Sequence, residues 1–292
     1  MNQSISRVLL YGSAALAISG IAITWATTST DADVVTLLSS ADSQLRLAHA
    51  MPVFDSEGNR LDSRDVMIVS AIEQLVKVER NEPGLAVTAE FRGFAHMLQD
   101  EFAAAAACYQ EASTRGDCSD EQRDVLTFNQ ARMLVQADQP DQALALFAAN
   151  KVALDARYGH QRRLEEATIL SGLNRSTEAV VRLDIIRSDE SASPMALLQA
   201  GRVYTSLHCL EAAEDVLMRT RKELVIADYY LAQLKLCQGQ TDISMELLER
   251  VSKARPIEVR RMLLDEANAW SAVLTDARFQ ELSKVVPASP GR

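Results

Sequence analysis

Apolar and small residues recur at helical spacing through most of this chain. Between residues 71 and 256, a small residue is followed four positions later by a bulky one, and in most copies by another apolar or small residue three positions further on. Positions i, i+4 and i+7 lie on one face of a helix. The spacings between the leading small residues are 34, 38, 36, 34 and 31. These residues are Ala71, Ala105, Ala143, Ala179, Ala213 and Ser244. A small residue at each of these points predicts that a neighbouring helix crosses close by.

A second helical pattern precedes each of the last five copies by about twelve residues. Before Ala213 it consists of Leu197, Ala200, Gly201 and Tyr204, and shorter versions precede the other copies. Helix-breaking residues separate the resulting units, at 81–84, 115–117, 193–194 and 254–256. The pattern therefore predicts a series of antiparallel helix pairs.

Local signals predict where individual helices begin and turn. Ser119 with Gln122 has the spacing of a capping box. Ser193 followed by Pro194 places a capping hydroxyl before a proline at the first helical position. Tight turns inside the pairs are expected at Pro140, Asn174 and Gly239. We also expect a helix over residues 34–51, a loop over 52–62, and a helical cap over 257–284 with Val259, Leu263, Trp270 and Leu274 on one face.

The composition favours helices throughout. The 292 residues include only 11 Gly and 7 Pro, and aromatic residues make up 5%. All-β sandwiches and barrels use more turn glycines and aromatic residues, so this class is disfavoured. Disorder is also disfavoured, because 48% of the residues are hydrophobic.

The helix-pair pattern resembles the tetratricopeptide repeat, a 34-residue helix–turn–helix unit with the signature Trp-x2-Leu-Gly-x2-Tyr, then Ala-x3-Phe, then Pro. The signature Trp is absent from every copy, and Ser244 replaces Ala in the last one. The resemblance covers roughly residues 63–256 and implies an all-α solenoid of stacked antiparallel helix pairs. A different helical-pair solenoid is the alternative fold. The pair that matches best contains Leu197, Ala200, Gly201, Tyr204, Ala213 and Leu217.

Residues 8–26 contain no charged side chain and are expected to form a single transmembrane helix. Nineteen helical residues span roughly 28 Å, close to the thickness of a bilayer's hydrocarbon core. A cleavable signal peptide is the alternative, although Thr24-Trp25-Ala26 matches a cleavage site poorly. Arg7 precedes the span and two aspartates follow it, which places the soluble part outside the cytoplasm, in the periplasm or an equivalent compartment.

These elements predict five segments along the chain. They are an N-terminal tail (1–6), a transmembrane anchor (7–28), a linker of one short helix and a loop (29–62), the repeats (63–256), and a capping helix with a tail (257–292).

Charge and motifs argue against nucleic-acid binding, metal binding and catalysis. The net charge is −10, and no basic stripe offsets it, so nucleic acid is an unfavourable partner. The four cysteines and four histidines lack zinc-ligand spacing. We find no nucleophile elbow, phosphate-binding glycine loop or metalloprotease motif, and we expect no enzymatic activity, cofactor or metal. Glu165 and Glu166 are interpreted as solvated helix surface.

The resemblance implies a function in binding, because the first helices of stacked pairs line a concave groove suited to an extended peptide or a partner helix. Two arginines among the expected groove residues suit carboxylates. We therefore expect a membrane-anchored scaffold that captures a protein or peptide. An architectural assembly factor that acts through its transmembrane helix, and an enzyme with an unrecognised site, are the alternatives. The groove positions expected to contact the partner are Phe94, Met97, Phe128, Arg132, Arg202 and Tyr229, with Glu90, Leu198 and Gln233 at equivalent positions.

Overall fold

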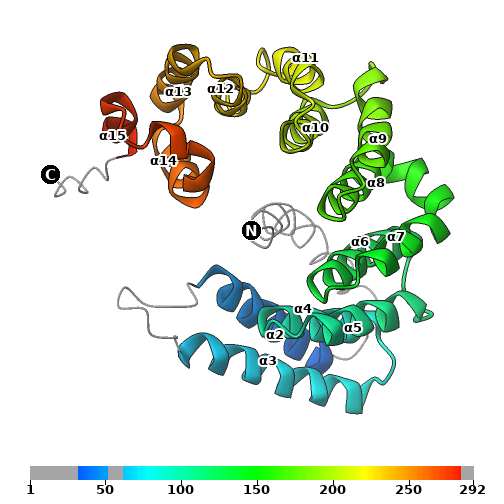
Figure 1. Ribbon diagram of the computed structural model, residues 1–292. Helices are drawn as coiled ribbons and strands as arrows, with labels where there is room; N and C mark the ends of the chain where they lie inside the picture. Colours follow the sequence, from blue (N-terminus) through cyan, green and yellow to red (C-terminus); the bar gives the residue numbers. More distant parts are fainter. Residues whose placement is uncertain (1–31, 52–61, 284–292) are drawn as a thin grey trace, which may run out of the picture. The chain divides into compact units, whose positions relative to one another are not determined.

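The chain is all-helical wherever the computed structural model describes it, at residues 32–51 and 62–283 (Figure 1). These residues form fourteen α-helices and one 3-10 helix, and no strand occurs among them. No helix in these two ranges is long and apolar enough to cross a membrane. The expected transmembrane span, residues 8–26, lies outside the described residues.

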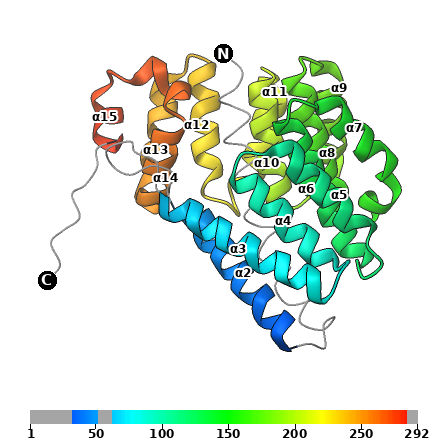
Figure 2. The same cartoon turned by 90° about the horizontal axis from the view of Figure 1, so that it is seen from below.

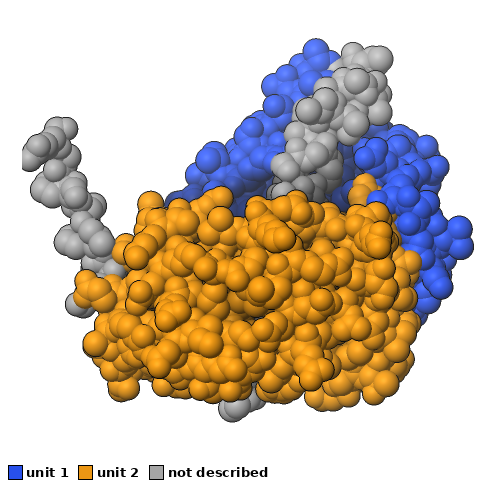
Figure 3. Space-filling model, turned by 90° about the horizontal axis from the view of Figure 1, so that it is seen from above, with its two compact units in different colours: residues 1–157 blue, residues 158–292 orange. Residues whose placement is uncertain are grey.

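The chain divides into two compact units, residues 1–157 and 158–292, which Figure 3 distinguishes by colour. The division falls inside α8 (Lys151–Gly172), at Tyr158, whose backbone is not helical (φ −133°, ψ 32°). We describe each unit by itself.

Unit 1 consists of consecutive helices that pack in adjacent pairs. Its described elements are α2 (Ala32–Ala50), α3 (Asp62–Asn81), α4 (Ala86–Leu98), α5 (Phe102–Thr114), α6 (Asp120–Gln136), α7 (Pro140–Ala149) and the start of α8. The pairs are α2 with α3, α4 with α5, and α6 with α7. The predicted capping box begins α6: the Ser119 hydroxyl accepts from the backbone N–H of Gln122, and the Gln122 side chain accepts from the N–H of Ser119.

Unit 2 continues the same arrangement. It contains the rest of α8 and then α9 (Ser176–Ser188), α10 (Pro194–Ser206), α11 (Leu210–Thr220), α12 (Ala227–Cys237), α13 (Thr241–Ala254), α14 (Pro256–Asp265), η3 (Ala267–Val273) and α15 (Ala277–Ser283). Helix α10 pairs with α11, and α12 pairs with α13. As predicted, Ser193 caps α10 by accepting from the N–H of Ala196, ahead of a proline in the first turn.

The small residues that lead the sequence repeat mark the tightest helix packing. All six, from Ala71 to Ser244, are fully buried. The glycines of the first helices explain the close approach, since a Cβ at Gly93 would lie 2.9 Å from the Tyr109 ring. Ser244 fits where the other copies have Ala because its hydroxyl donates to the carbonyl of Ala232 at 2.7 Å.

The turns between five pairs of consecutive helices have the same backbone geometry; these are α4–α5, α6–α7, α8–α9, α10–α11 and α12–α13. One residue in every turn has a positive φ of 58–74°, and it lies five positions before the small leading residue. The following N–H donates to a carbonyl five residues earlier, as from Glu101 to His96 (2.9 Å) and from Gln240 to Lys235 (2.8 Å). This bond satisfies carbonyls that a helix end would otherwise leave open. The repetition supports a helical-repeat solenoid. The positive-φ residues are Asp100, Asp138, Asn174, His208 and Gly239.

Helix α2 forms a helix pair with α3 and lies along it (Figures 1 and 2). It is the short helix that the sequence predicts within residues 29–62. The Arg64 guanidinium donates to the Ala48 carbonyl at 3.2 Å, and Gln74 donates to Gln44 at 3.3 Å. The pairing follows from an apolar stripe on α2 that is fully buried: Val34, Leu38, Ala41, Leu45 and Ala48.

The C-terminal cap also differs from the expectation of one apolar face over residues 257–284. Helix α14 ends at Asp265, the backbone of Glu266 is not helical (φ −111°, ψ 29°), and the chain continues as the 3-10 helix η3. Trp270 is fully buried, as expected, but Leu274 is about half exposed. The tighter period of the 3-10 helix rotates later residues away from the face predicted for an α-helix.

Candidate functional site

The six residues predicted to line a groove lie on four first helices. The structure places Phe94 and Met97 on α4, Phe128 and Arg132 on α6, Arg202 on α10, and Tyr229 on α12. Five of the six are buried, and Arg202 is the exception, with 18% of its side chain exposed. Arg202 is therefore the predicted residue most accessible to a partner.

In unit 1, the aromatic groove positions pack against neighbouring helices. The Phe94 ring contacts the ring of His49 on α2, with centroids 5.7 Å apart. The Phe128 ring contacts Phe147 on α7 at 5.5 Å. Burial, together with the charge of Arg64, lowers the pKa of His49 and favours its neutral form. These contacts explain the burial of both phenylalanines through packing within the unit.

In unit 2, Arg202 and Tyr229 are brought together around one carboxylate, that of Glu266. The Tyr229 hydroxyl donates to Glu266 Oε2 at 3.2 Å, and the Gln233 amide donates to the same oxygen at 2.6 Å. Arg202 Nη2 lies 3.7 Å from Glu266 Oε1. Helices α10 and α12 supply the donors, and Glu266 lies at the break between α14 and η3. We call Arg202, Tyr229, Gln233 and Glu266 the carboxylate cluster.

A network of aromatic rings holds the carboxylate cluster in place. The Trp270 indole N–H donates to the Tyr229 oxygen at 3.1 Å, and the two ring centroids are 5.5 Å apart. The Arg202 guanidinium carbon lies 4.8 Å from the centre of the Tyr230 ring, within the range of a cation–π interaction. Burial raises the pKa of Tyr230 to about 12 and that of Tyr229 above its usual range. Both phenols are therefore protonated at neutral pH, and Tyr229 acts as a hydrogen-bond donor.

This arrangement surrounds a carboxylate with two hydrogen-bond donors and one guanidinium. A phenol and an amide fix one oxygen, and a guanidinium faces the other. Charged partners make such hydrogen bonds stronger than neutral ones. The sequence predicts Arg202, Tyr229 and Gln233 at groove positions and Trp270 only on the apolar face of the cap, and it does not predict a role for Glu266. Trp270 is a large aromatic residue in the cap and offered a signal, whereas nothing in the local sequence marks Glu266.

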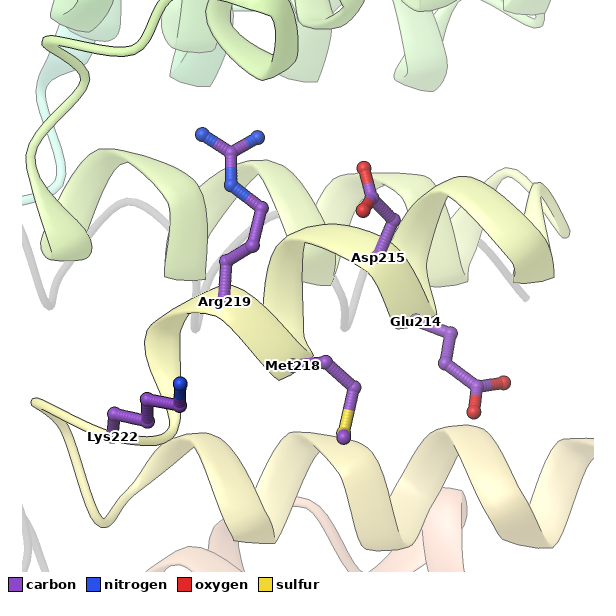
Figure 4. A pocket seen from close by; sticks show the side chains of 5 residues that line it. All are labelled: Glu214, Asp215, Met218, Arg219 and Lys222. Atoms are coloured by element: carbon purple, nitrogen blue, oxygen red, sulfur yellow. The ribbon is translucent and has the colours of Figure 1, made fainter.

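A separate hollow in unit 2 lies on α11 and the turn after it (Figure 4). It is open to solvent and has a volume of about 410 Å³. Its acidic side chain Glu214 is bound by Lys235 (2.6 Å) and Gln238 (3.2 Å), and these contacts lower the pKa of Glu214. All five lining residues come from this one segment, so the hollow lacks the convergent donors of the carboxylate cluster. They are Glu214, Asp215, Met218, Arg219 and Lys222.

Neither a protein-family model nor a curated protein matches this chain. Across residues 32–51 and 62–283, no group of three His, Cys, Asp or Glu side chains is arranged to hold a metal ion. The features that bear on function are therefore the helix pairs and the carboxylate cluster.

Proposed function

We propose that this protein is a membrane-anchored scaffold of the tetratricopeptide type, which captures a protein or peptide partner on the first-helix face of its repeats. The observation that carries the proposal is the convergence of Arg202, Tyr229 and Gln233, from two successive first helices, on a single carboxylate. Solenoids bind extended chains along the concave surface that successive repeats form. Here side chains of adjacent repeats converge on the chain's own Glu266, which supports carboxylate recognition on this face.

The proposed partner presents a carboxylate to unit 2. Arg202 stacks on Tyr230, but its polar contacts to Gln199 (3.3 Å) and Glu266 (3.7 Å) are both long. A guanidinium has five N–H donors, so Arg202 has the capacity for a second, bidentate carboxylate. Tyr230, which is buried beneath the guanidinium, supports Arg202 from the protein side.

The membrane part of the proposal comes from the sequence. Residues 8–26 form an uncharged stretch of membrane-spanning length, and the basic residue before it favours an extracytoplasmic location for the repeats. In this arrangement the scaffold holds its partner at an envelope surface and carries out no chemistry.

Site-specific photo-crosslinking in intact membranes tests the proposal. A photoreactive amino acid replaces Met195 in one chain and Met218 in the control, so that Arg202 is kept in both. Met195 lies on α10 two turns before Arg202 and is about half exposed, and Met218 lies on the second helix of the same pair and is also partly exposed. We expect a discrete protein adduct from position 195 and none from 218. Absence of an adduct at 195, or the same adducts at both positions, would contradict groove binding.

A second experiment distinguishes the groove-binding scaffold from the alternative, an architectural assembly factor that acts through its transmembrane helix. Residues 8–26 are exchanged for an unrelated transmembrane helix of the same length. A groove-binding scaffold keeps its crosslinked partner after this exchange, because the anchor only fixes its location. An assembly factor that acts through the native span loses its function.

A further inference from the structure

Helix α3 exposes a stripe of valines on the face opposite its core. Val66, Val69 and Val76 are 65%, 50% and 43% exposed. The core face of the same helix is fully buried and consists of Ile68, Ala71, Leu75 and Val78. Outer positions of a helical hairpin usually carry polar residues, because they face water.

The paired helix α2 provides an internal comparison. Its outer face carries Thr36, Ser39 and Ser43, which are exposed and polar, and a single large apolar residue, Leu47, near its end. Helices α2 and α3 nevertheless have nearly equal lengths and the same spacing of core residues. Within unit 1, α3 packs against α2 and α4, and neither covers the valines. The apolar stripe is therefore specific to α3.

The valines belong to a longer seam with alternating spacings of four and three residues. This is the heptad spacing by which one helix packs along another. The seam is acidic at its first position and basic at its last, with valines between. Its residues are Asp62, Val66, Val69, Glu73, Val76 and Arg80.

We propose that this seam is a dimerisation surface, on which α3 packs antiparallel against α3 of a second copy of the chain. A two-fold axis level with Ala71 places Asp62 against Arg80 and Val66 against Val76, each pair formed twice. A surface that pairs with itself about a two-fold axis must be complementary to its own reverse, and the charges and valines of this seam meet that condition. A parallel arrangement would instead place Asp62 against Asp62 and Arg80 against Arg80.

Glu73 keeps this association weak. In the antiparallel register it lies across from Val69. The two Glu73 residues lie on either side of the two-fold axis and are offset by about 6 Å along the helix direction, because four residues with a rise of about 1.5 Å each separate their levels. Replacing Glu73 with Leu removes this repulsion and extends the apolar seam. We expect the dissociation constant of the dimer to fall at least tenfold.

Cysteine crosslinking of the full chain in its membrane tests the register. The background chain carries Cys237→Ser, since Cys237 is an exposed cysteine. Differently tagged copies with Val66→Cys and Val76→Cys are expressed together and oxidised. We expect a mixed dimer, whereas Val66→Cys alone forms none, because its two sulfurs would be about 15 Å apart along the helix axis. Ser43→Cys on the polar face of α2 is the control.

Charge reversal provides an independent measurement on the same chains. Asp62→Arg alone and Arg80→Asp alone each juxtapose like charges and reduce the mixed crosslink, and the double variant restores it. All these positions are exposed, so circular dichroism of each variant is expected to match that of the parent chain. A mixed crosslink no stronger than the Ser43 control, a strong Val66→Cys self-crosslink, or failure of the double charge reversal would each overturn the proposal. The test does not involve the carboxylate cluster, so its outcome is independent of the proposed groove.

Discussion

Gly201 on α10 and Leu217 on α11 are in such close contact that the two helices can cross here only because glycine has no side chain. A Cβ built on Gly201 would lie 2.6 Å from Leu217 Cγ and 3.2 Å from Val216 Cγ2. Leu217 and Val216 are both fully buried, so neither side chain can move out into solvent without losing its packing. The contact joins α10 to α11 and thereby fixes the helix that carries Arg202.

Gly201→Ala is therefore expected to destabilise the protein, although alanine is the better helix former. Overpacking of a buried site costs about 1–3 kcal/mol, which exceeds the roughly 1 kcal/mol gained in helix propensity. Gly172→Ala is the control, since a Cβ there meets nothing within 4 Å. Urea unfolding should show a loss for Gly201→Ala and none for Gly172→Ala. Equal effects would mean that the crossing is not as close as described.

Ala213→Leu tests the small residue that leads the same repeat. Ala213 is fully buried, whereas its neighbour Ala212 is only half-buried. A leucine at 213 must displace packed neighbours, at a cost of about 1–3 kcal/mol in unfolding free energy. A leucine at 212 extends toward solvent and should change stability by less than about 0.5 kcal/mol. A neutral Ala213→Leu would refute the assigned repeat register.

Glu90 makes the stability of unit 1 depend on pH. Burial, reinforced by the nearby charge of Asp42, raises the pKa of Glu90 from 4.5 to about 7. The folded protein therefore holds a proton that the unfolded chain releases between pH 4.5 and 7. Over this interval, unfolding free energy falls as pH rises, and above about pH 7 this group has no further effect. The stabilising contribution is fully present below pH 4.5.

Glu90→Gln should remove this dependence, because the amide is neutral at every pH. The variant is expected to be more stable than the parent chain by about 3 kcal/mol at pH 8, with the difference vanishing near pH 4. Thermal unfolding across this pH range measures the effect. Glu211→Gln, at an exposed position, is the control. A parent chain whose stability rises between pH 5 and 7 while Glu90→Gln stays parallel to it would exclude the assignment.

Tyr229→Phe tests the hydrogen bonds that support the carboxylate cluster. The substitution leaves the buried Trp270 indole N–H without its acceptor and Glu266 without one donor. An unsatisfied buried donor costs about 1–3 kcal/mol, and the Trp fluorescence should change in the folded state. Tyr230→Phe keeps a ring beneath Arg202 and serves as the matched variant. Identical stabilities for the two would indicate that the Tyr229 hydroxyl is not buried in this network.

Much of the repeat architecture could be predicted from the sequence, because close helix crossings require small residues at regular intervals. The capping residues Ser119 and Ser193 are likewise local signals, and the structure confirms both. The turns could be predicted only in part. Asn174 and Gly239 mark two of them in the sequence, whereas the turns at Asp100 (φ 61°) and His208 (φ 58°) were not predicted.

The carboxylate cluster could be predicted only on the side contributed by the repeats. Arg202, Tyr229 and Gln233 occupy regular positions of first helices, so their shared face follows from periodicity. Glu266 joins them through a break in the cap, and a contact between residues 64 positions apart leaves no local signal. Glu166 was likewise interpreted as solvated, but it is buried, and Arg182 binds its carboxylate from α9 at 2.7 Å.

The central claim is that a partner binds through the guanidinium of Arg202, and its most direct test is retention of that partner by the purified full chain. The partner identified by crosslinking is quantified by mass spectrometry after purification of the parent chain, Arg202→Ala and Arg219→Ala. Arg219 is an exposed arginine on the second helix of the same pair, so its loss changes the net charge equally. We predict at least a tenfold loss of partner for Arg202→Ala and none for Arg219→Ala. Equal retention by all three chains would contradict the claim.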